Sequence, residues 1–317
     1  MKKYLIIFFS LYAFYLNAQD IHFSQFQISK TLINPALTGS FKSDFQAILQ
    51  RRSQWSSVGS PFKTISLAFY AKDFLLNKSF GINLINDNTG ESNFKTSGLN
   101  ISLSQEFLEN DKTILSFGAL VGAFQRTFEL SSLVFLEEEG IIDESIFFLD
   151  FAVGSSFFQK INNSFDIRGG LSLYHINKPN QSFSFTSQLS TPIKYNFHFT
   201  SNYYFTNEIT VSSSLFSSKQ LSYKEFIYGL DLYYDLPIDL YENNKLCIGI
   251  YGRYRDAIIP KIGINLNQFS VNVLYDVNIS DFAIATNNYG AFEFSISYNW
   301  NIISKDSKKH FICPKYL

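Results

Sequence analysis

Apolar and polar residues alternate along most of this chain, in one segment after another. The stretch 292–300 is the clearest, since Phe, Phe, Ile, Tyr and Trp alternate there with Glu, Ser, Ser and Asn. Successive side chains of a β-strand point to opposite faces of the sheet, so such a stretch predicts a strand with one apolar face. The same pattern is found at residues 65–72, 115–123, 165–173, 195–205, 226–234 and 246–254.

The composition of the two faces indicates the class of sheet. The apolar faces end in Tyr, Trp or Phe, and aromatic residues make up 18% of the chain, as is typical of strands that cross a lipid interface. A closed barrel with a polar interior suits both faces, since an open sheet edge is not tolerated in lipid. The polar faces carry charges that need water or a charged partner: Asp166, Arg168, Asp231, Asp235, Arg253 and Arg255.

We therefore predict an all-β fold, a transmembrane antiparallel barrel of about 14 strands over residues 46–303, since spans of about 9–11 residues fit this length. A soluble two-sheet sandwich is the alternative. Residues 86–90, Asn-Asp-Asn-Thr-Gly, predict a turn. Residues 136–145 predict an acidic loop, either a solvated connection or a recognition loop at the barrel mouth. Residues 304–317 are expected to form a periplasmic C-terminal tail.

The first 18 residues predict a signal peptide. Two lysines follow Met1, an apolar stretch continues to Leu16, and Ala18 precedes Gln19 at the expected cleavage point. The alternative is a single N-terminal anchor helix, for which the apolar stretch is short. We therefore expect a protein that leaves the cytoplasm and becomes a multi-pass component of the outer membrane.

The pattern of residues 19–45 indicates neither a strand nor an amphipathic helix, and we interpret them as an N-terminal docking segment. Asn34-Pro35 predicts a turn, because proline fixes its own φ and keeps the preceding residue out of the helical region. Gly39 is expected to close this turn with a positive φ. Phe23 and Phe26 are held on this short bent segment and need a surface to pack on.

No pattern in the sequence indicates catalysis. The chain lacks a Gly-x-Ser-x-Gly elbow, a His-Glu-x-x-His pair, a phosphate-binding glycine loop and a Cys-x-x-Cys motif. Its four histidines are scattered without metal-ligand spacing, and the net charge of −1 does not favour nucleic acid. We expect no enzyme activity, no cofactor and no metal. Cys247 and Cys313 are either paired or free thiols.

Several blocks, in a fixed order along the chain, resemble the PorP/SprF proteins of the type IX secretion system of Bacteroidetes. The blocks are Asp20-Ile21-His22-Phe23-Ser24-Gln25-Phe26 with Asn34-Pro35-Ala36 and Gly39, Arg51-Arg52-Ser53-Gln54-Trp55, Pro61-Phe62-Lys63-Thr64, residues 170–183, 252–257 and 275–277, and Cys313-Pro314-Lys315-Tyr316. Two departures are Ile21, where the family often has proline, and Lys315-Tyr316, where Arg-Phe is common.

This resemblance implies an outer-membrane barrel that helps to deliver secreted proteins and to retain them at the cell surface, gliding adhesins among them. The implied partners are a secreted cargo protein with a C-terminal sorting domain, other type IX secretion components and outer-membrane lipid. An outer-membrane channel or hydrophobic-solute transporter is the alternative on the same barrel, and a soluble secreted adhesin is a third.

Two groups of candidate site residues follow from these observations. The docking segment supplies His22, Phe23, Phe26, Asn34, Pro35 and Gly39. A polar network in the lumen is expected from Arg51, Arg52, Arg168, Arg253, Arg255 and Asp256.

Overall fold

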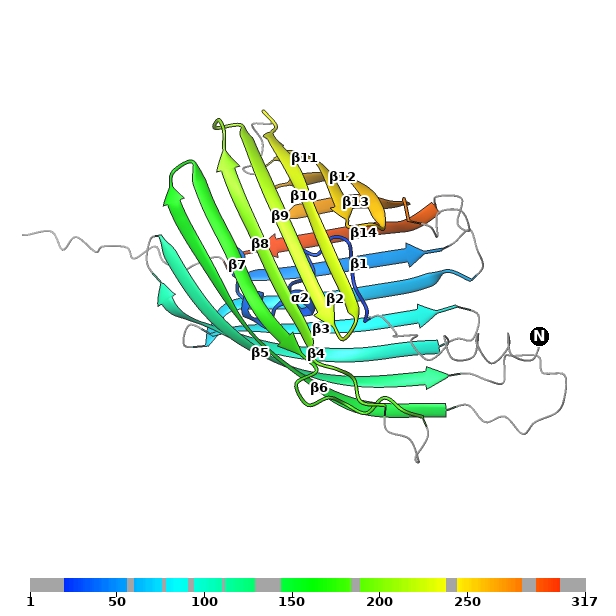
Figure 1. Ribbon diagram of the computed structural model, residues 1–317. Coiled ribbons are helices and arrows are strands. Elements are labelled where there is room, and N and C mark those ends of the chain that lie inside the picture. The colour runs from blue at the N-terminus through cyan, green and yellow to red at the C-terminus, as the bar shows by residue number, and fades with distance from the viewer. Residues whose placement is uncertain are drawn as a thin grey trace, which may run out of the picture.

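The computed structural model of the protein shows a closed antiparallel β-barrel of fourteen strands (Figure 1). Each strand pairs with its neighbour in sequence, and β1 pairs with β14 to close the sheet. The predicted fold class is therefore confirmed. The structure describes residues 20–55, 60–75, 78–90, 94–109, 112–128, 144–183, 189–237, 244–280 and 289–302.

The strands fall where the alternating segments predict them. They are β1 (Phe45–Gln54), β2 (Phe62–Leu75), β3 (Lys78–Thr89), β4 (Phe94–Glu109), β5 (Thr113–Phe128), β6 (Glu144–Asn162), β7 (Phe165–Tyr174), β8 (Lys194–Tyr204), β9 (Ile209–Gln220), β10 (Tyr223–Asp235), β11 (Lys245–Arg253), β12 (Ala257–Leu266), β13 (Phe269–Asn278) and β14 (Tyr289–Trp300).

Burial in this barrel is the reverse of that in a water-soluble domain. On β10, the apolar Phe226 and Leu230 are exposed on the outer wall, whereas Glu225 and Asp231 are buried inside. Serines, asparagines and charged residues are buried on the inner faces of the other strands as well. An outer wall of exposed Leu, Ile, Phe and Tyr requires an apolar solvent, so the wall faces lipid.

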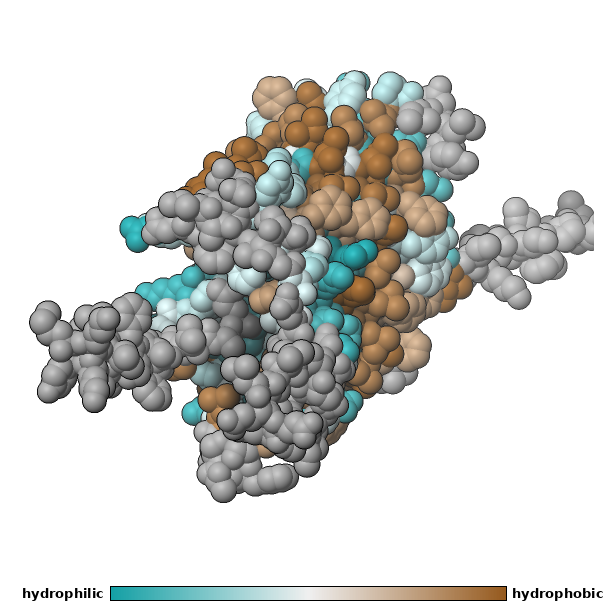
Figure 2. Space-filling view, turned by 90° about the vertical axis from the view of Figure 1, so that its right-hand side faces the viewer, coloured by the Kyte–Doolittle hydropathy of each residue, from teal (hydrophilic) through white to brown (hydrophobic). Residues whose placement is uncertain are grey.

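The two ends of the barrel differ. The end where β1 begins and β14 ends, here called the base end, carries stacked outward aromatic rings that include Phe45, Phe69 and Trp300. The opposite end, here called the loop end, carries the three longest connections between strands, 129–143, 175–193 and 279–288. Figure 2 views the loop end, with hydrophobic side chains on the wall and hydrophilic ones toward the middle.

The segment before β1 lies inside the barrel. Residues 20–44, here called the plug, run from the loop end, where Asp20 contacts His175, to the base end, where β1 begins at Phe45 (Figure 1). The plug contains one turn of helix, α2 (Lys30–Ile33), and a short 3₁₀ helix, η2 (Pro35–Leu37). Among the described residues, no helix is long and apolar enough to cross a membrane.

Two local expectations are wrong. Residues 86–89 continue β3, and only Gly90 has the positive φ of a turn, because Asp87 on the inner face accepts a hydrogen bond from Thr64. Gly39 has no positive φ. It is needed for space, since a Cβ there would lie 2.2 Å from the Ser79 hydroxyl. The signal peptide, most of the acidic loop and the tail lie outside the described residues.

The lipid-facing wall predicts a depth-dependent cost for charge. Leu67 is exposed in the middle of β2, so Leu67→Arg should cost about 2–4 kcal/mol of folding stability in a bilayer. Phe74→Arg, near the base end of the same strand, should cost about 0–1 kcal/mol. Urea titration of the barrel refolded in lipid vesicles measures both, and an equal cost at the two positions would contradict this assignment of the wall.

Candidate functional site: the plugged lumen

The plug turns at Asn34-Pro35, and this turn rests on strands that lack side chains at the point of contact. A Cβ on Gly118 of β5 would lie 2.4 Å from the Ala36 nitrogen, and one on Gly154 of β6 would lie 2.0 Å from Asn34 Oδ1. A Cβ on Gly170 of β7 would lie 2.7 Å from Asn34 Nδ2. Three neighbouring strands thus form a glycine cradle, which here means Gly118, Gly154 and Gly170.

Asn34 fixes the register of the plug on this cradle. Its amide nitrogen donates to the Ser155 carbonyl oxygen at 2.8 Å and to that of Leu171 at 3.2 Å. Its amide oxygen accepts from the Ala36 backbone N–H at 2.9 Å, which caps η2. Proline at position 35 keeps Asn34 extended, with φ −159° and ψ 116°, so the side chain can reach the wall. Asn34 is fully buried.

Phe26 anchors the other side of the plug. Its ring stacks on Phe216 at a centroid distance of 5.4 Å and meets the edge of Tyr251 at 6.4 Å. Ile227 and Ile259 belong to the same buried cluster, so β9–β12 present an unusual apolar patch to the lumen. Removing a phenylalanine ring from such a cluster costs about 3–5 kcal/mol. The plug is therefore held by packing as well as by hydrogen bonds.

A buried charged network crosses the lumen near the loop end. Arg52 of β1 lies 3.1 Å from Asp276 of β13, and it also pairs with Glu293 of β14. Arg253 of β11 lies 3.1 Å from the same Asp276 oxygen and 3.3 Å from Glu225 of β10. Removing one member of a buried ion-pair network leaves a partner uncompensated and costs about 3–5 kcal/mol.

The plug completes this network at Ser24. The Ser24 hydroxyl donates to Asp276 at 2.9 Å and accepts from Arg52 at 2.7 Å, while Arg253 donates to the same hydroxyl. The backbone N–H groups of Ser24 and Gln25 donate to the two Glu293 oxygens at 2.6 and 3.0 Å. Four charged residues of the wall thus converge on two successive plug residues.

The structure brings only some of the expected lumen residues together. Arg52 and Arg253 share the network, and Asp256 joins it at the rim, 3.0 Å from Arg253. Arg51 alternates with Arg52 and is exposed on the outer wall, so its assignment to the lumen is wrong. Arg255 is likewise outside the lumen, in the turn after β11.

The remaining candidates lie inside the barrel at separate points. Arg168 projects into the lumen nearer the base end, where it donates to Ser40 of the plug. His22 lies 3.8 Å from Glu225, and Phe23 is buried. The cleavage point at Ala18 and Gln19 lies outside the described residues.

Sequence reasoning missed the acidic half of the network and its plug partner. Asp276, Glu293 and Glu225 are all buried on inner faces. Period-two alternation places Glu293 on the polar face, between the outward Phe292 and Phe294, but it does not identify the charged partners of Glu293. Nothing in the local pattern around Ser24 signals its role, because its partners are 229 or more residues distant, except Arg52, 28 residues away.

An ionic clamp holds the start of the plug at the loop end. His175, which follows β7, has Nε2 2.7 Å from Asp20 and Nδ1 3.0 Å from Asp150, and Lys194 lies 3.5 Å from Asp20. Burial disfavours protonation of His175, but the two carboxylates outweigh it and raise the pKa of His175 to about 9. Burial alone would raise the pKa of Asp20, but the charges and hydrogen bonds of Lys194 and His175 outweigh it and hold this pKa below its ordinary value.

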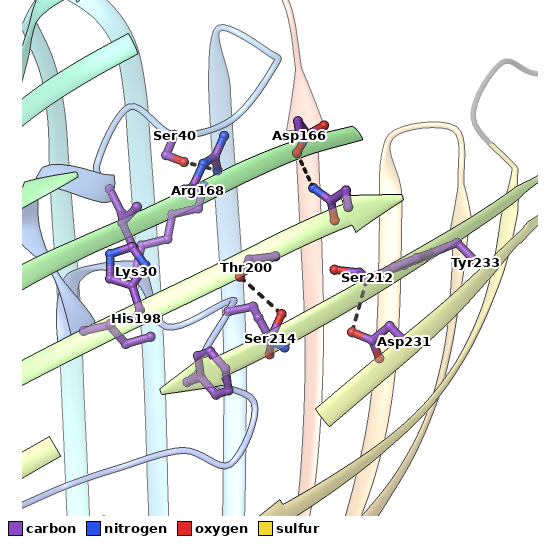
Figure 3. A pocket seen from close by; sticks show the side chains of 15 residues that line it. Lys30, Ser40, Asp166, Arg168, His198, Thr200, Ser212, Ser214, Asp231 and Tyr233 are labelled. Atoms are coloured by element: carbon purple, nitrogen blue, oxygen red, sulfur yellow. Dashed lines mark hydrogen bonds between the residues drawn. The ribbon is translucent and has the colours of Figure 1, made fainter. Parts of the chain in front are cut away.

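A cavity of about 250 Å³ remains between the plug and β7–β10 (Figure 3). Lys30 and His198 line it together with Arg168, and Asp166 and Asp231 lie across from them. In the part of the chain that the structure describes, no group of three His, Cys, Asp or Glu side chains is placed to hold a metal ion. Cys247 is a free, buried thiol, and Cys313 lies outside the described residues.

A closed barrel with a lipid-facing wall, a polar lumen and a plug from its own chain defines this protein as a plugged membrane β-barrel. The family described as "Type IX secretion system membrane protein PorP/SprF" matches residues 16–298, so the chain belongs to that family. The resemblance predicted from the sequence blocks is confirmed. No curated protein matches the sequence.

Solved structures are similar in fold. The Pseudomonas putida toluene transporter TodX superposes with a TM-score of 0.50 at 9% identity, covering 85% of this chain and 92% of TodX. A Pseudomonas aeruginosa FadL homologue gives 0.48 at 8% identity, with 84% and 93% coverage, and the KdgM porin gives 0.43 at 8%, with 81% and 99%. At these identities the likeness concerns the fold alone.

The glycine cradle predicts that a single methyl group displaces the plug. Gly118→Ala places a Cβ against plug backbone and should destabilise the docked plug by about 1–3 kcal/mol. Gly252→Ala is the matched control, because the three atoms nearest a Cβ there all belong to the flexible Tyr228 side chain. Hydrogen exchange of amides in residues 24–41 should accelerate in the first variant alone. Unchanged exchange in Gly118→Ala would refute the cradle.

The ionic clamp predicts a pH dependence. A histidine whose pKa is raised in the folded state stabilises fully below its ordinary pKa of 6.5, and this contribution is lost as pH rises through about 9. His175→Gln should therefore lower the urea midpoint relative to the unchanged protein at pH 6, and the difference should shrink by pH 10. A difference that is constant across this range would show that His175 is not protonated in the clamp.

Proposed function

We propose that this protein is a non-enzymatic outer-membrane component of the type IX secretion system that binds a secreted cargo protein and anchors it at the cell surface. The cargo is held through its C-terminal sorting domain, and gliding adhesins are among the candidates. The observation that carries the proposal is the plugged lumen. A barrel closed by its own chain offers a rigid surface at its mouth and has no need of a reactive group.

The loop end is the surface that this proposal assigns to the cargo. Membrane barrels of this type have short periplasmic turns and longer extracellular loops. The loop end, where the longest connections between strands begin, therefore faces the outside, and the base end faces the periplasm. The signal peptide over residues 1–18 remains a prediction that agrees with this orientation.

The rigidity of the mouth supports a binding role. Ser24 links Arg52, Arg253 and Asp276, so residues of β1, β11 and β13 are tied to one another through the plug. On the other side of the mouth, Asp20 links His175 and Lys194. A surface whose shape is fixed before binding loses little conformational entropy when a partner docks.

A channel or hydrophobic-solute transporter is the second candidate. The observation in its favour is the cavity between plug and wall, which leaves part of the lumen unfilled. Against it, the plug runs through the lumen, and most of its residues from Phe23 to Gly39 are buried. Planar-bilayer recording separates the two: a cargo anchor should show no steady conductance until the plug is displaced, for example by Gly118→Ala. Steady conductance of the unchanged protein would favour the channel.

The direct test is a pull-down of the tagged, full-length protein from detergent-solubilised outer membranes. We expect one large secreted protein to co-purify, and we expect its capture to be lost when its C-terminal domain is removed. Deletion of the barrel should leave that cargo unattached or unsecreted, with re-expression as the control. Normal surface display of secreted proteins in the deletion strain would contradict the proposal.

A further inference from the structure

Two lysines face each other on the outer wall at the loop end. Lys219 lies one residue before the end of β9 and Lys224 one residue after the start of β10, and the two residues are directly opposite in the register of this hairpin. Both are exposed and point to the lipid side, on the same faces as Leu215 and Phe226. Like charges directly opposite on one face of a sheet repel each other and destabilise the pair.

Arg255 adds a third positive charge beside this pair. It belongs to the turn between β11 and β12 and has φ 60°, a left-handed conformation that arginine seldom adopts. Asp256 holds the turn in place, since its backbone N–H donates to the Arg253 carbonyl oxygen at 3.0 Å and its carboxylate pairs with Arg253. The guanidinium lies 5.2 Å from the centre of the Tyr254 ring.

No acidic side chain compensates these three charges within the described residues. Glu225, the nearest carboxylate in sequence, faces the lumen, where it pairs with Arg253. Asp256 is likewise engaged with Arg253. Lys219, Lys224 and Arg255, here called the basic cluster, therefore present a net charge of +3 at the edge of the apolar wall.

The surface below the basic cluster is shaped for an apolar chain. One step nearer the middle of the wall, Ser217, Phe226 and Tyr254 form a row across three strands, with Ser217 opposite Phe226 and Tyr254 bonded to Phe226 through the backbone. The small Ser217 lies next to the two rings. These residues and the basic cluster line one hollow of about 480 Å³, together with Ser218 and Glu225. The Glu225 carboxylate there is paired with Arg253.

We propose that this hollow is a lipid site in which the basic cluster binds the phosphate of an outer-leaflet lipid. The first part of an acyl chain lies over Ser217, beside Phe226 and Tyr254. Lysines at the edge of the apolar band can extend toward the headgroup layer while their stems stay in the hydrocarbon. Lysine supplies a compact positive charge, and arginine can donate two parallel hydrogen bonds to phosphate oxygens.

This inference goes beyond cargo binding and uses only the orientation of the barrel given above. In that orientation the β9–β10 hairpin reaches the outer leaflet, where phosphate groups form the anionic layer. A bound phosphate also removes the cost of the Lys219–Lys224 pair. The site therefore accounts for a charge arrangement that would otherwise weaken the hairpin.

Native mass spectrometry of the full-length barrel in detergent tests the proposal. The probes are a bisphosphorylated disaccharide lipid, the same lipid without its phosphates, and inorganic phosphate. We expect the bisphosphorylated lipid to bind best, and Lys219→Gln/Lys224→Gln/Arg255→Gln to weaken its binding by about tenfold or more, since charge-assisted hydrogen bonds are the strong ones. Lys42→Gln/Lys78→Gln/Lys160→Gln removes the same charge from exposed positions near the base end and should bind as the unchanged protein does.

Three outcomes would overturn the proposal: equal binding in both triple variants, equal binding of the dephosphorylated lipid, or competition by inorganic phosphate with no preference for lipid. A single variant guards against misfolding of the triple one. Lys219→Gln removes the repulsion between the two lysines, so the unfolding midpoint of this variant should rise in lipid-free detergent. The bisphosphorylated lipid should raise the midpoint of this variant by less than it raises that of the unchanged protein. Cargo capture by the triple variant is measured in parallel, so failure of the lipid site and failure of the cargo proposal are distinguishable.

Discussion

Every backbone N–H and C=O group of a chain in lipid must find a partner within the protein, and the rest of this structure depends on that requirement. The sheet satisfies it only by closing β1 on β14, which removes both edges. Closure with strands that alternate apolar and polar residues then creates a polar interior. That interior holds buried charges such as Arg52, Asp276 and Glu293, which need partners of their own.

The plug supplies partners for these buried charges. It brings a hydroxyl and two backbone N–H groups to the charged network at Ser24 and Gln25, and it brings Phe26 to an apolar patch of the inner wall. At Asn34 it exploits strands whose glycines leave room for an amide side chain to reach backbone carbonyl oxygens. Wall and plug are thus complementary in charge, in polarity and in shape, although most of their contacts join residues far apart in sequence.

The sequence alone was enough for the barrel because the signal for each strand is local. Alternation from Phe292 to Trp300 depends only on neighbouring residues, and it survives any arrangement of the other strands. The residues that line the lumen are harder to predict, since an error of one residue in the position of a strand exchanges its inner and outer faces. Arg51 and Arg52 are adjacent, but only Arg52 points inward. Gly39 shows a further limit, because its role is set by the approach of Ser79, which no local pattern records.

One consequence of the plug concerns how it can move. Its last residue is joined directly to β1, the strand that closes the barrel against β14, where Phe45 stacks on Trp300. The plug is therefore covalently tethered to the barrel: it can be displaced but cannot diffuse away. It re-enters the lumen at an effective concentration set by its own length. A pulling force on the plug at the loop end would therefore act on the first residues of β1, at the base end of the β1–β14 pairing. The loop end and the strand pair that closes the barrel are thereby mechanically coupled.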